Sequence, residues 1–259
     1  MYPSTLPAVT PWIPGRSVTS TAPFRLFCFP YAGIGVSAYR SWGLSLGSDV
    51  EICPVQLPGR ESRQHETPLT SIDTMVDEVA DGLRPYMNVP FALFGHSMGG
   101  LLAFELARRL KGNANIRRLF VSARRAPHLT EPLPAIASLS SPDFVAIVQQ
   151  RYGGIPPAVL ACEDLLELLL PRLRADFQAL ETYEFRSADP LSCGISVFGG
   201  RQDTVSDSDL RAWGTHTAGG IRVRMVDAGH LYLESRRDVL LKAIADDLAI
   251  DRRAYEVAW

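Results

Sequence analysis

The stretch "FALFGHSMGG", residues 91–100, joins an apolar run to a helical pattern through a glycine-rich turn. Gly95, Ser97 and Gly99 fit the pattern G-x-S-x-G, and "LLAFELARRLK" follows directly. Small residues on either side of a serine permit a sharp strand-to-helix turn that exposes its hydroxyl. A glycine-rich turn with a capping serine is the alternative, but a strand before it and a helix after it favour a nucleophile. We therefore predict that residues 95–99 form a nucleophile elbow, the tight turn that presents Ser97 as a catalytic nucleophile.

Outward from this stretch, short apolar runs alternate with longer amphipathic segments. Six runs are typical of strands buried on both faces, over residues 25–29, 50–56, 91–95, 117–123, 195–200 and 221–227. Helical patterns lie between them, at about 37–46, 71–87, 98–111, 206–213 and 235–248. This alternation predicts a doubly wound α/β domain with a mostly parallel central sheet flanked by helices. Residues of about 128–190 contain two or three helical segments between strands, and we expect a helical lid there, over the ligand crevice.

A serine nucleophile needs a histidine as base and an acid to orient that histidine. When the serine lies on this kind of turn, the aspartate or glutamate comes after it in the chain and the histidine comes last. His230 in "VDAGHLYL" comes at the end of a late strand and is the predicted general base. Asp203 follows the preceding strand and is the predicted acid. Asp207 and Asp209 are rivals, but they fall where a helix starts and fit N-terminal helix charges better. The other histidines lie inside the elbow or in polar segments typical of solvated surface: His96, His65, His128 and His216.

The loop "FPYAGIGVSA", residues 29–38, has two incompatible interpretations. Gly33, Gly35 and Ala38 match the fingerprint G-x-G-x-x-G/A of a dinucleotide site. Such a site needs an acidic residue at the end of the second strand, where this chain has Gln56. We therefore reject the cofactor interpretation and expect no cofactor.

The remaining interpretation is an oxyanion loop, in which a backbone N–H turns toward a reacting carbonyl. The N–H of Met98, directly after the nucleophile, supplies one donor of such a hole. Tyr31 or Ala32 supplies the other, and we favour Ala32.

The composition excludes several classes of function. A chain of 259 residues, 46% hydrophobic and 21% charged, suits one large α/β domain. Its formal net charge of −2 gives no basic excess for nucleic acid or an anionic membrane. The four cysteines are far apart and show no metal-ligand spacing: Cys28, Cys53, Cys162 and Cys193. We therefore expect that they bind no metal and that they are free thiols in a reducing cytoplasm.

The two ends of the chain differ from the segment between them. Residues 1–23 are rich in Pro, Ser and Thr and predict a flexible leader that is neither signal peptide nor anchor. Residues 24–250 are the predicted domain, and residues 251–259 a tail. No apolar run approaches the roughly 20 residues of a membrane span.

Six segments, in this order, carry a family resemblance: "LFCFPYAG", "LPGRESR", "FGHSMGG", "LPRLRADF", "GGRQD" and "AGHLYL". They resemble the type II thioesterases that accompany modular polyketide synthases and nonribosomal peptide synthetases, from about Arg25 to Leu248. "PGRESR" and "PRLRADF" are more specific than the elbow, which many esterases share. One departure is Ile34 in "AGIGVS", where the family commonly has a second consecutive glycine.

The resemblance implies an α/β-hydrolase core with a helical lid and the triad Ser97, Asp203 and His230. It also implies hydrolysis of acyl thioesters on the phosphopantetheine arm of acyl or peptidyl carrier proteins, to remove stalled or wrong acyl groups. A general carboxylesterase or a chain-releasing thioesterase is the alternative. The initiator methionine, the leader and the lack of an upstream carrier attachment motif argue against a domain cut from a synthase. An inactive binding protein is disfavoured because the triad is intact.

Other residues have two interpretations each. Arg124 and Arg125 in "SARRAP" follow a strand and lie near the catalytic edge of the sheet. They could bind the phosphate of the pantetheine arm or an acidic carrier protein, or they could be solvated surface residues. Tyr31 and Ile34 are candidates for the pocket wall. "LLELLL", residues 165–170, lines an acyl chamber or simply packs.

Overall fold

The computed structural model describes residues 10–14, 22–43 and 45–256. Six strands form one sheet in the order β2-β1-β3-β4-β5-β6, and every pairing is parallel. The strands are β1 (Phe24–Phe29), β2 (Val50–Pro54), β3 (Phe91–His96), β4 (Ile116–Ser122), β5 (Gly194–Gly200) and β6 (Ile221–Val226). The predicted parallel sheet is therefore confirmed, because near-continuous apolar runs mark strands that helices cover on both faces.

Seven α-helices and four short 3-10 helices lie within the described residues. The α-helices are α1 (Ile72–Leu83), α2 (Met98–Arg109), α3 (Ser141–Tyr152), α4 (Pro157–Leu160), α5 (Glu163–Glu181), α6 (Asp207–Arg211) and α7 (Arg237–Glu256). The 3-10 helices are η1 (Val36–Tyr39), η2 (Glu61–Arg63), η3 (Arg84–Tyr86) and η4 (Ala212–His216).

The predicted helix at 37–46 is wrong, since η1 is the only helix among the residues of that segment that the structure describes. Gly43 lies inside the segment, and Gly47 directly after it has a φ of +76°, outside the helical region. Tyr39 and Trp42 are buried against the sheet. The apolar spacing in this segment therefore reflects loop side chains that cover one face.

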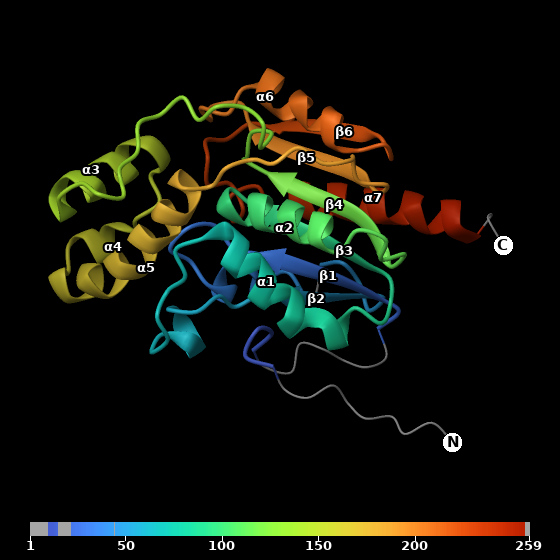
Figure 1. Ribbon diagram of the computed structural model, residues 1–259, viewed down its shortest axis with the longest axis horizontal. Coiled ribbons are helices and arrows are strands. Elements are labelled where there is room, and N and C mark those ends of the chain that lie inside the picture. Colours follow the sequence, from blue (N-terminus) through green and yellow to red (C-terminus); the bar gives the residue numbers. More distant parts are fainter. Residues whose placement is uncertain (1–9, 15–21, 44, 257–259) are drawn as a thin grey trace.

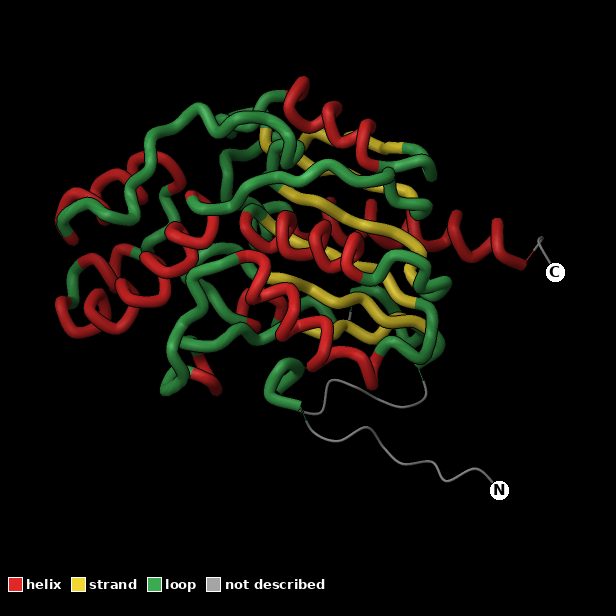
Figure 2. The backbone as a smooth tube through the Cα atoms, viewed as in Figure 1, coloured by secondary structure: helices red, strands yellow, loops and turns green. Residues whose placement is uncertain are grey.

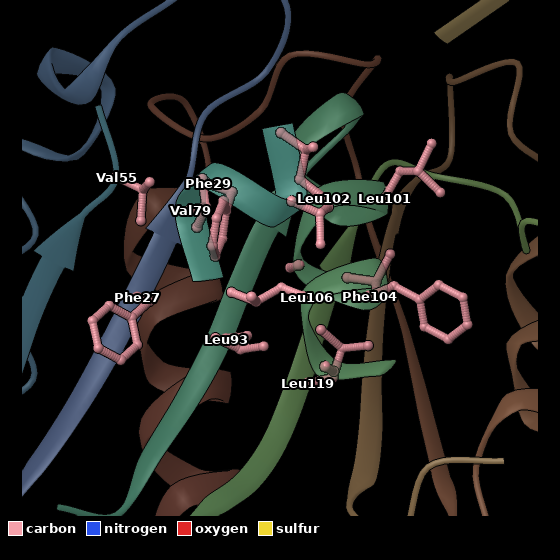
Figure 3. Packing of buried hydrophobic residues seen from close by; sticks show 14 of the residues in the cluster. Phe27, Phe29, Val55, Val79, Leu93, Leu101, Leu102, Phe104, Leu106 and Leu119 are labelled. Carbon is pink, nitrogen blue, oxygen red and sulfur yellow. The ribbon is translucent and has the colours of Figure 1, made fainter. Parts of the chain in front are cut away.

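Two layers of helices enclose the sheet (Figure 1). Helices α1, α2 and α6 cover one face, where Phe27 and Phe29 of β1 belong to the same buried cluster as Leu101 and Leu106 of α2 (Figure 3). Helix α7 and the loop after η1 cover the other face, in a second cluster of buried side chains. Alternate side chains of each strand enter different clusters, so the central strands have no solvated face.

The carboxyl ends of the strands point toward α3, α4 and α5, which we call the helical insertion (Figure 1). Figure 2 shows the helices of the insertion in red, to one side of the yellow strands. The insertion follows β4 and precedes β5, as expected from residues of about 128–190. The strand order reverses at β1, which lies between β2 and β3. Ligands of doubly wound sheets bind in the crevice at such a point. The turn after β1 and the turn after β3 therefore meet beneath the helical insertion.

The expectation of a flexible leader over residues 1–23 is wrong for residues 10–14, which pack on the domain. Trp12 and Ile13 are buried, and the Trp12 carbonyl accepts a hydrogen bond from the Gln56 N–H at 2.8 Å. The Arg63 guanidinium lies 4.1 Å from the Trp12 ring centroid. Two apolar side chains thus anchor a segment whose composition predicts no structure. Residues 1–9 and 15–21 of the expected leader lie outside the described residues.

The carboxyl end also differs from the prediction. Helix α7 continues through Glu256, beyond the expected end at residue 248 and into the segment expected as a tail. Residues 257–259 lie outside the described residues. Within the described part of the chain, no helix combines the length and apolar character that a membrane span requires.

Candidate active site

Ser97 lies on a tight turn between β3 and α2. Its backbone has φ 53° and ψ −117°, a conformation that is strained for any residue other than glycine. The flanking glycines allow close backbone approach: a Cβ on Gly95 would lie 1.9 Å from the Gly99 carbonyl oxygen. A Cβ on Gly99 would lie 2.1 Å from the Phe29 carbonyl oxygen of β1. The G-x-S-x-G pattern is therefore a packing requirement, and it presents the Ser97 hydroxyl at the end of the sheet.

Ser97, His230 and Asp203 form one hydrogen-bonded chain. The Ser97 Oγ lies 3.0 Å from His230 Nε2, and His230 Nδ1 lies 2.9 Å from Asp203 Oδ2. The loops after β6 and β5 bring His230 and Asp203 to the same sheet edge as Ser97. The His230 and Asp203 side chains are 7% and 1% exposed, so water does not compete for their contact. This arrangement suits proton transfer from the serine hydroxyl to the imidazole.

The two rival carboxylates are engaged elsewhere. Asp209 caps α6 through Ser206 and accepts a hydrogen bond from Arg125 at 2.8 Å. Asp207 forms an ion pair with Arg211 at 2.6 Å and is half exposed. The structure therefore brings only Asp203, of the three candidate acids, to the His230 ring.

The turn after β1 faces the elbow and offers backbone donors. The Ile34 N–H donates to the Tyr31 carbonyl at 3.2 Å, and the Gly33 N–H donates to Asp176 Oδ2 at 2.7 Å. These two donors are occupied, which leaves the N–H groups of Tyr31 and Ala32 as the alternatives that the sequence left open. Met98, the first residue of α2, lies opposite this turn, at the positive end of the helix dipole.

A cavity of about 590 Å³ lies between the strand ends and the helical insertion, and Ser97 and His230 open into it. This volume is within the range of ligand pockets in proteins. The insertion supplies an apolar wall that includes Leu169, Leu173 and Phe177. "LLELLL" contributes to both of the roles considered: Leu165, Leu168 and Leu169 line the cavity, and Leu169 also belongs to the buried cluster of the insertion.

The four residues proposed for substrate contact all line this cavity: Tyr31, Ile34, Arg124 and Arg125. Arg125 is held by Asp209 and by the Thr130 carbonyl at 2.7 Å. Arg124 is only 17% exposed, 4.0 Å from Glu131, and its buried Nε has no hydrogen-bond partner among the described residues. Burial lowers the pKa of the Arg124 guanidinium.

Of the three histidines predicted on the solvated surface, His65 and His128 are exposed and His216 is buried. His96 is fully buried beneath the active site, and its Nδ1 lies 2.9 Å from Ser122 Oγ. Burial and the nearby His230 keep the pKa of His96 well below its usual value. His216 is buried as well and contacts His128 at 2.7 Å, so the prediction is wrong for His216. Besides the nearby Trp213, its aromatic neighbours Phe104 and Phe185 come from distant segments, so its burial cannot be read from the local sequence.

Several residues of the site had no predicted role. The Tyr152 ring of α3 lies over His230, with the ring centroids 5.0 Å apart. Arg60 and Asp176 form a buried ion pair with two contacts of 2.8 Å. The segments "PGRESR" and "PRLRADF" contain this pair, but a contact between residues so far apart in the chain cannot be read from either segment.

Side chains of the kinds that bind metal ions are dispersed in the described part of the chain. The described ranges contain no group of three or more His, Cys, Asp or Glu side chains able to hold a metal ion. Cys28 and Cys53 are buried free thiols, and burial raises the pKa of each.

Comparison with known proteins places the chain in a recognisable group. A family model described as a thioesterase domain matches residues 24–248. The gramicidin S biosynthesis protein GrsT of Aneurinibacillus migulanus is 40% identical over 236 residues, covering 90% of this chain and 92% of GrsT. RedJ, a thioesterase from the prodiginine biosynthetic pathway in Streptomyces coelicolor, aligns with a TM-score of 0.81 and 37% identity, covering 88% of this chain and 87% of RedJ.

A second solved structure agrees with the first. The type II thioesterase BorB, from the borrelidin biosynthetic cluster, aligns with a TM-score of 0.78 and 36% identity, covering 89% of this chain and 93% of BorB. Together with the parallel sheet and the elbow, these likenesses confirm the α/β-hydrolase fold predicted from the sequence.

Proposed function

This chain belongs to the thioesterase domain family, and from that premise we propose that it hydrolyses acyl thioesters carried on the phosphopantetheine arm of carrier proteins. Its role is to remove stalled or wrong acyl groups in polyketide or nonribosomal peptide biosynthesis. The observation that carries the proposal is the hydrogen-bonded chain from Asp203 through His230 to Ser97, which opens into a cavity of about 590 Å³. GrsT, RedJ and BorB are named for the biosynthesis of gramicidin S, prodiginine and borrelidin, and the description of BorB as a type II thioesterase supports the same substrate class.

The proposed reaction has two halves. His230 Nε2 takes the Ser97 proton as the Oγ attacks the thioester carbonyl, and Asp203 stabilises the imidazolium. The N–H groups of Ala32 and Met98 hold the oxyanion. His230 then returns the proton to the sulfur as the C–S bond breaks, and the pantetheine thiol leaves. A water molecule then attacks the acyl-serine carbonyl as His230 takes its proton, and His230 passes this proton to the Ser97 Oγ as the acyl C–O bond breaks, which frees the carboxylic acid and restores the serine.

The helical insertion is proposed as a lid over the bound acyl group. Its residues Leu169, Leu173 and Phe177 form the apolar wall of the cavity. Arg124 lies at the polar side with an unpartnered buried Nε, and we assign it to a polar group of the pantetheine arm or of the carrier. Arg125 is held by Asp209 and is the weaker candidate.

The test compares kcat/KM for one acyl group on a carrier protein and on N-acetylcysteamine. Remote binding energy raises kcat/KM only when the whole substrate is present, so the carrier-bound form should react faster. Short groups such as acetyl and propionyl should be accepted. Arg124→Ala should narrow the difference, whereas Arg84→Ala, an exposed arginine next to the amino end of β3, should leave it unchanged.

Each alternative has its own outcome. Equal values on the two supports would favour a general carboxylesterase. Reaction with long chains but not with acetyl or propionyl groups would favour a chain-releasing thioesterase. Failure of the wild-type chain to react with a fluorophosphonate would favour an inactive binding protein. Ser97→Ala, which lacks the nucleophile, is the unreactive control for this measurement.

A further inference from the structure

The turn of residues 31–34 is held by side chains of the helical insertion, and this contact has a consequence for catalysis. We propose that Asp176, Arg172 and Arg60 are positioning residues that fix the turn so that the Ala32 N–H faces the oxyanion. The inference rests on the proposed function of Ser97 and names what assembles the second half of its oxyanion hole.

Two side chains of α5 bind both backbone groups of Gly33. Asp176 Oδ2 accepts the Gly33 N–H at 2.7 Å, and Arg172 Nε donates to the Gly33 carbonyl at 3.0 Å. Residues four apart lie on the same face of a helix. One face of α5 therefore fixes the peptide planes on both sides of Gly33.

The same face packs tightly against the turn. Gly33 has a φ of +78°, and a Cβ there would lie 2.7 Å from Leu173 Cδ1 and 3.4 Å from Leu169 Cδ1. Leu169, Arg172, Leu173 and Asp176 follow the helical spacing i, i+3, i+4, i+7. A shift of α5 would therefore move the turn with it.

The peptide plane that carries the Ala32 N–H also contains the Tyr31 carbonyl. That carbonyl accepts the Ile34 N–H at 3.2 Å, and the Ile34 carbonyl accepts from Arg60 at 3.3 Å. All three peptide planes from Tyr31 to Ile34 thus have a fixed hydrogen bond. The direction of the Ala32 N–H is set by this series of contacts.

Arg60 links the turn to Asp176 from the opposite side. It meets both carboxylate oxygens of Asp176 at 2.8 Å, and the two side chains are 1% and 0% exposed. A buried ion pair is a weak source of stability, because desolvation offsets much of the attraction, and apolar residues of similar size often pack as well. A bidentate pair does fix geometry. We therefore assign the pair to orientation of the turn.

Two variants separate orientation from stability. Asp176→Asn keeps the size and one acceptor but loses the charge, and the double variant Arg60→Met with Asp176→Leu replaces the buried pair with apolar packing. Both should lower kcat on acyl-N-acetylcysteamine by about 10- to 100-fold, since misplacing one oxyanion donor forfeits part of its contribution. KM should change little. Affinity for a trifluoromethyl ketone, which forms an oxyanion on Ser97, should fall by the same factor, whereas affinity for an inert thioether should not.

Glu51→Gln is the matched control. Glu51 forms a buried ion pair with Arg25 at 3.1 Å, at the amino ends of β1 and β2, opposite the active site. It should lower the thermal midpoint and leave kcat and ketone affinity unchanged. The inference is overturned if both Asp176 variants have wild-type kcat at temperatures below their thermal midpoints. It is also overturned if their affinities for the trifluoromethyl ketone and for the inert thioether fall by the same factor.

The outcome also separates this inference from the proposed function. A wild-type chain that reacts with a fluorophosphonate but releases no acyl group from carriers would reject the proposed substrate. The positioning role would then still be read from the rates of phosphonylation and of p-nitrophenyl butyrate hydrolysis, which need the same oxyanion hole. If the wild type fails to react with the fluorophosphonate, both proposals are rejected.

Discussion

Replacing Asp203 with asparagine should inactivate the enzyme without unfolding it. Asp203 Oδ1 accepts the Val205 N–H at 3.4 Å, and Oδ2 faces His230 Nδ1 at 2.9 Å. In Asp203→Asn the amide oxygen keeps the Val205 contact, so the amide NH₂ faces Nδ1 and donates to it. His230 then carries its proton on Nε2, 3.0 Å from Ser97 Oγ, and cannot accept the serine proton.

The expected loss follows from this change of tautomer. In serine hydrolases with the same arrangement it lowers kcat by about 10⁴, which is about 5 kcal/mol of activation free energy. Asp203 is 1% exposed, so water cannot restore the lost acceptor. Thiol release from acyl-N-acetylcysteamine measures kcat and KM, and KM should change far less than kcat.

Asp207→Asn is the control, because this exposed carboxylate pairs with Arg211 and should be replaceable with little loss of rate. A loss below tenfold in Asp203→Asn, or a larger loss in Asp207→Asn, would refute the assignment of the acid. Circular dichroism and the thermal midpoint should be close to those of the wild type for both variants.

Three further predictions concern stability. Trp12→Ala removes a side chain that is 7% exposed and should lower the free energy of unfolding by about 3–5 kcal/mol in urea titration; a loss below about 1 kcal/mol would show that residues 10–14 do not dock in solution. Gly33→Ala forces a Cβ to within 2.7 Å of Leu173 at a φ of +78° and should cost about 1–2 kcal/mol, with a parallel fall in kcat; unchanged values would contradict the packing of the turn. Burial, with His128 as a lesser cause, lowers the pKa of His216 from 6.5 to about 4, so the unfolded chain binds a proton that the folded chain refuses. The free energy of unfolding should therefore fall as pH drops through this interval, by at most about 1.4 kcal/mol per pH unit, and His216→Gln should weaken that dependence; an equal slope in the variant would exclude His216 as the cause.

The sheet and the nucleophile turn were predictable because their signals are local. Each of the six strands begins and ends within two residues of its predicted bounds, since a strand covered on both faces needs an unbroken apolar run. The elbow needs Gly95 and Gly99 within five residues of sequence, and the backbone contacts explain why. The order of Ser97, Asp203 and His230 follows from strand order, and the structure brings these three side chains together.

The features that were missed depend on contacts between distant segments. Asp176 in "PRLRADF" appears as one more charge on a helix until Arg60 from "PGRESR" is placed beside it. Trp12 lies in a Pro- and Ser-rich segment, and only its contacts with the Gln56 backbone and the Arg63 side chain show that it is anchored. The helix expected at 37–46 failed although its apolar spacing was real, because its buried side chains Tyr39 and Trp42 lie on a short 3-10 helix and on the turn that follows it.

The helical insertion has a hydrophobic cluster of its own, separate from the two that cover the sheet. Val148, Leu169, Leu173 and Phe177 belong to this cluster and also line the cavity. An exchange at one of them reshapes the cavity wall without opening a void on either face of the sheet. Descendants of one ancestral chain can thus diverge in the length and branching of the acyl group they accept through point mutations in a small satellite core, while the architecture that aligns the triad is inherited intact.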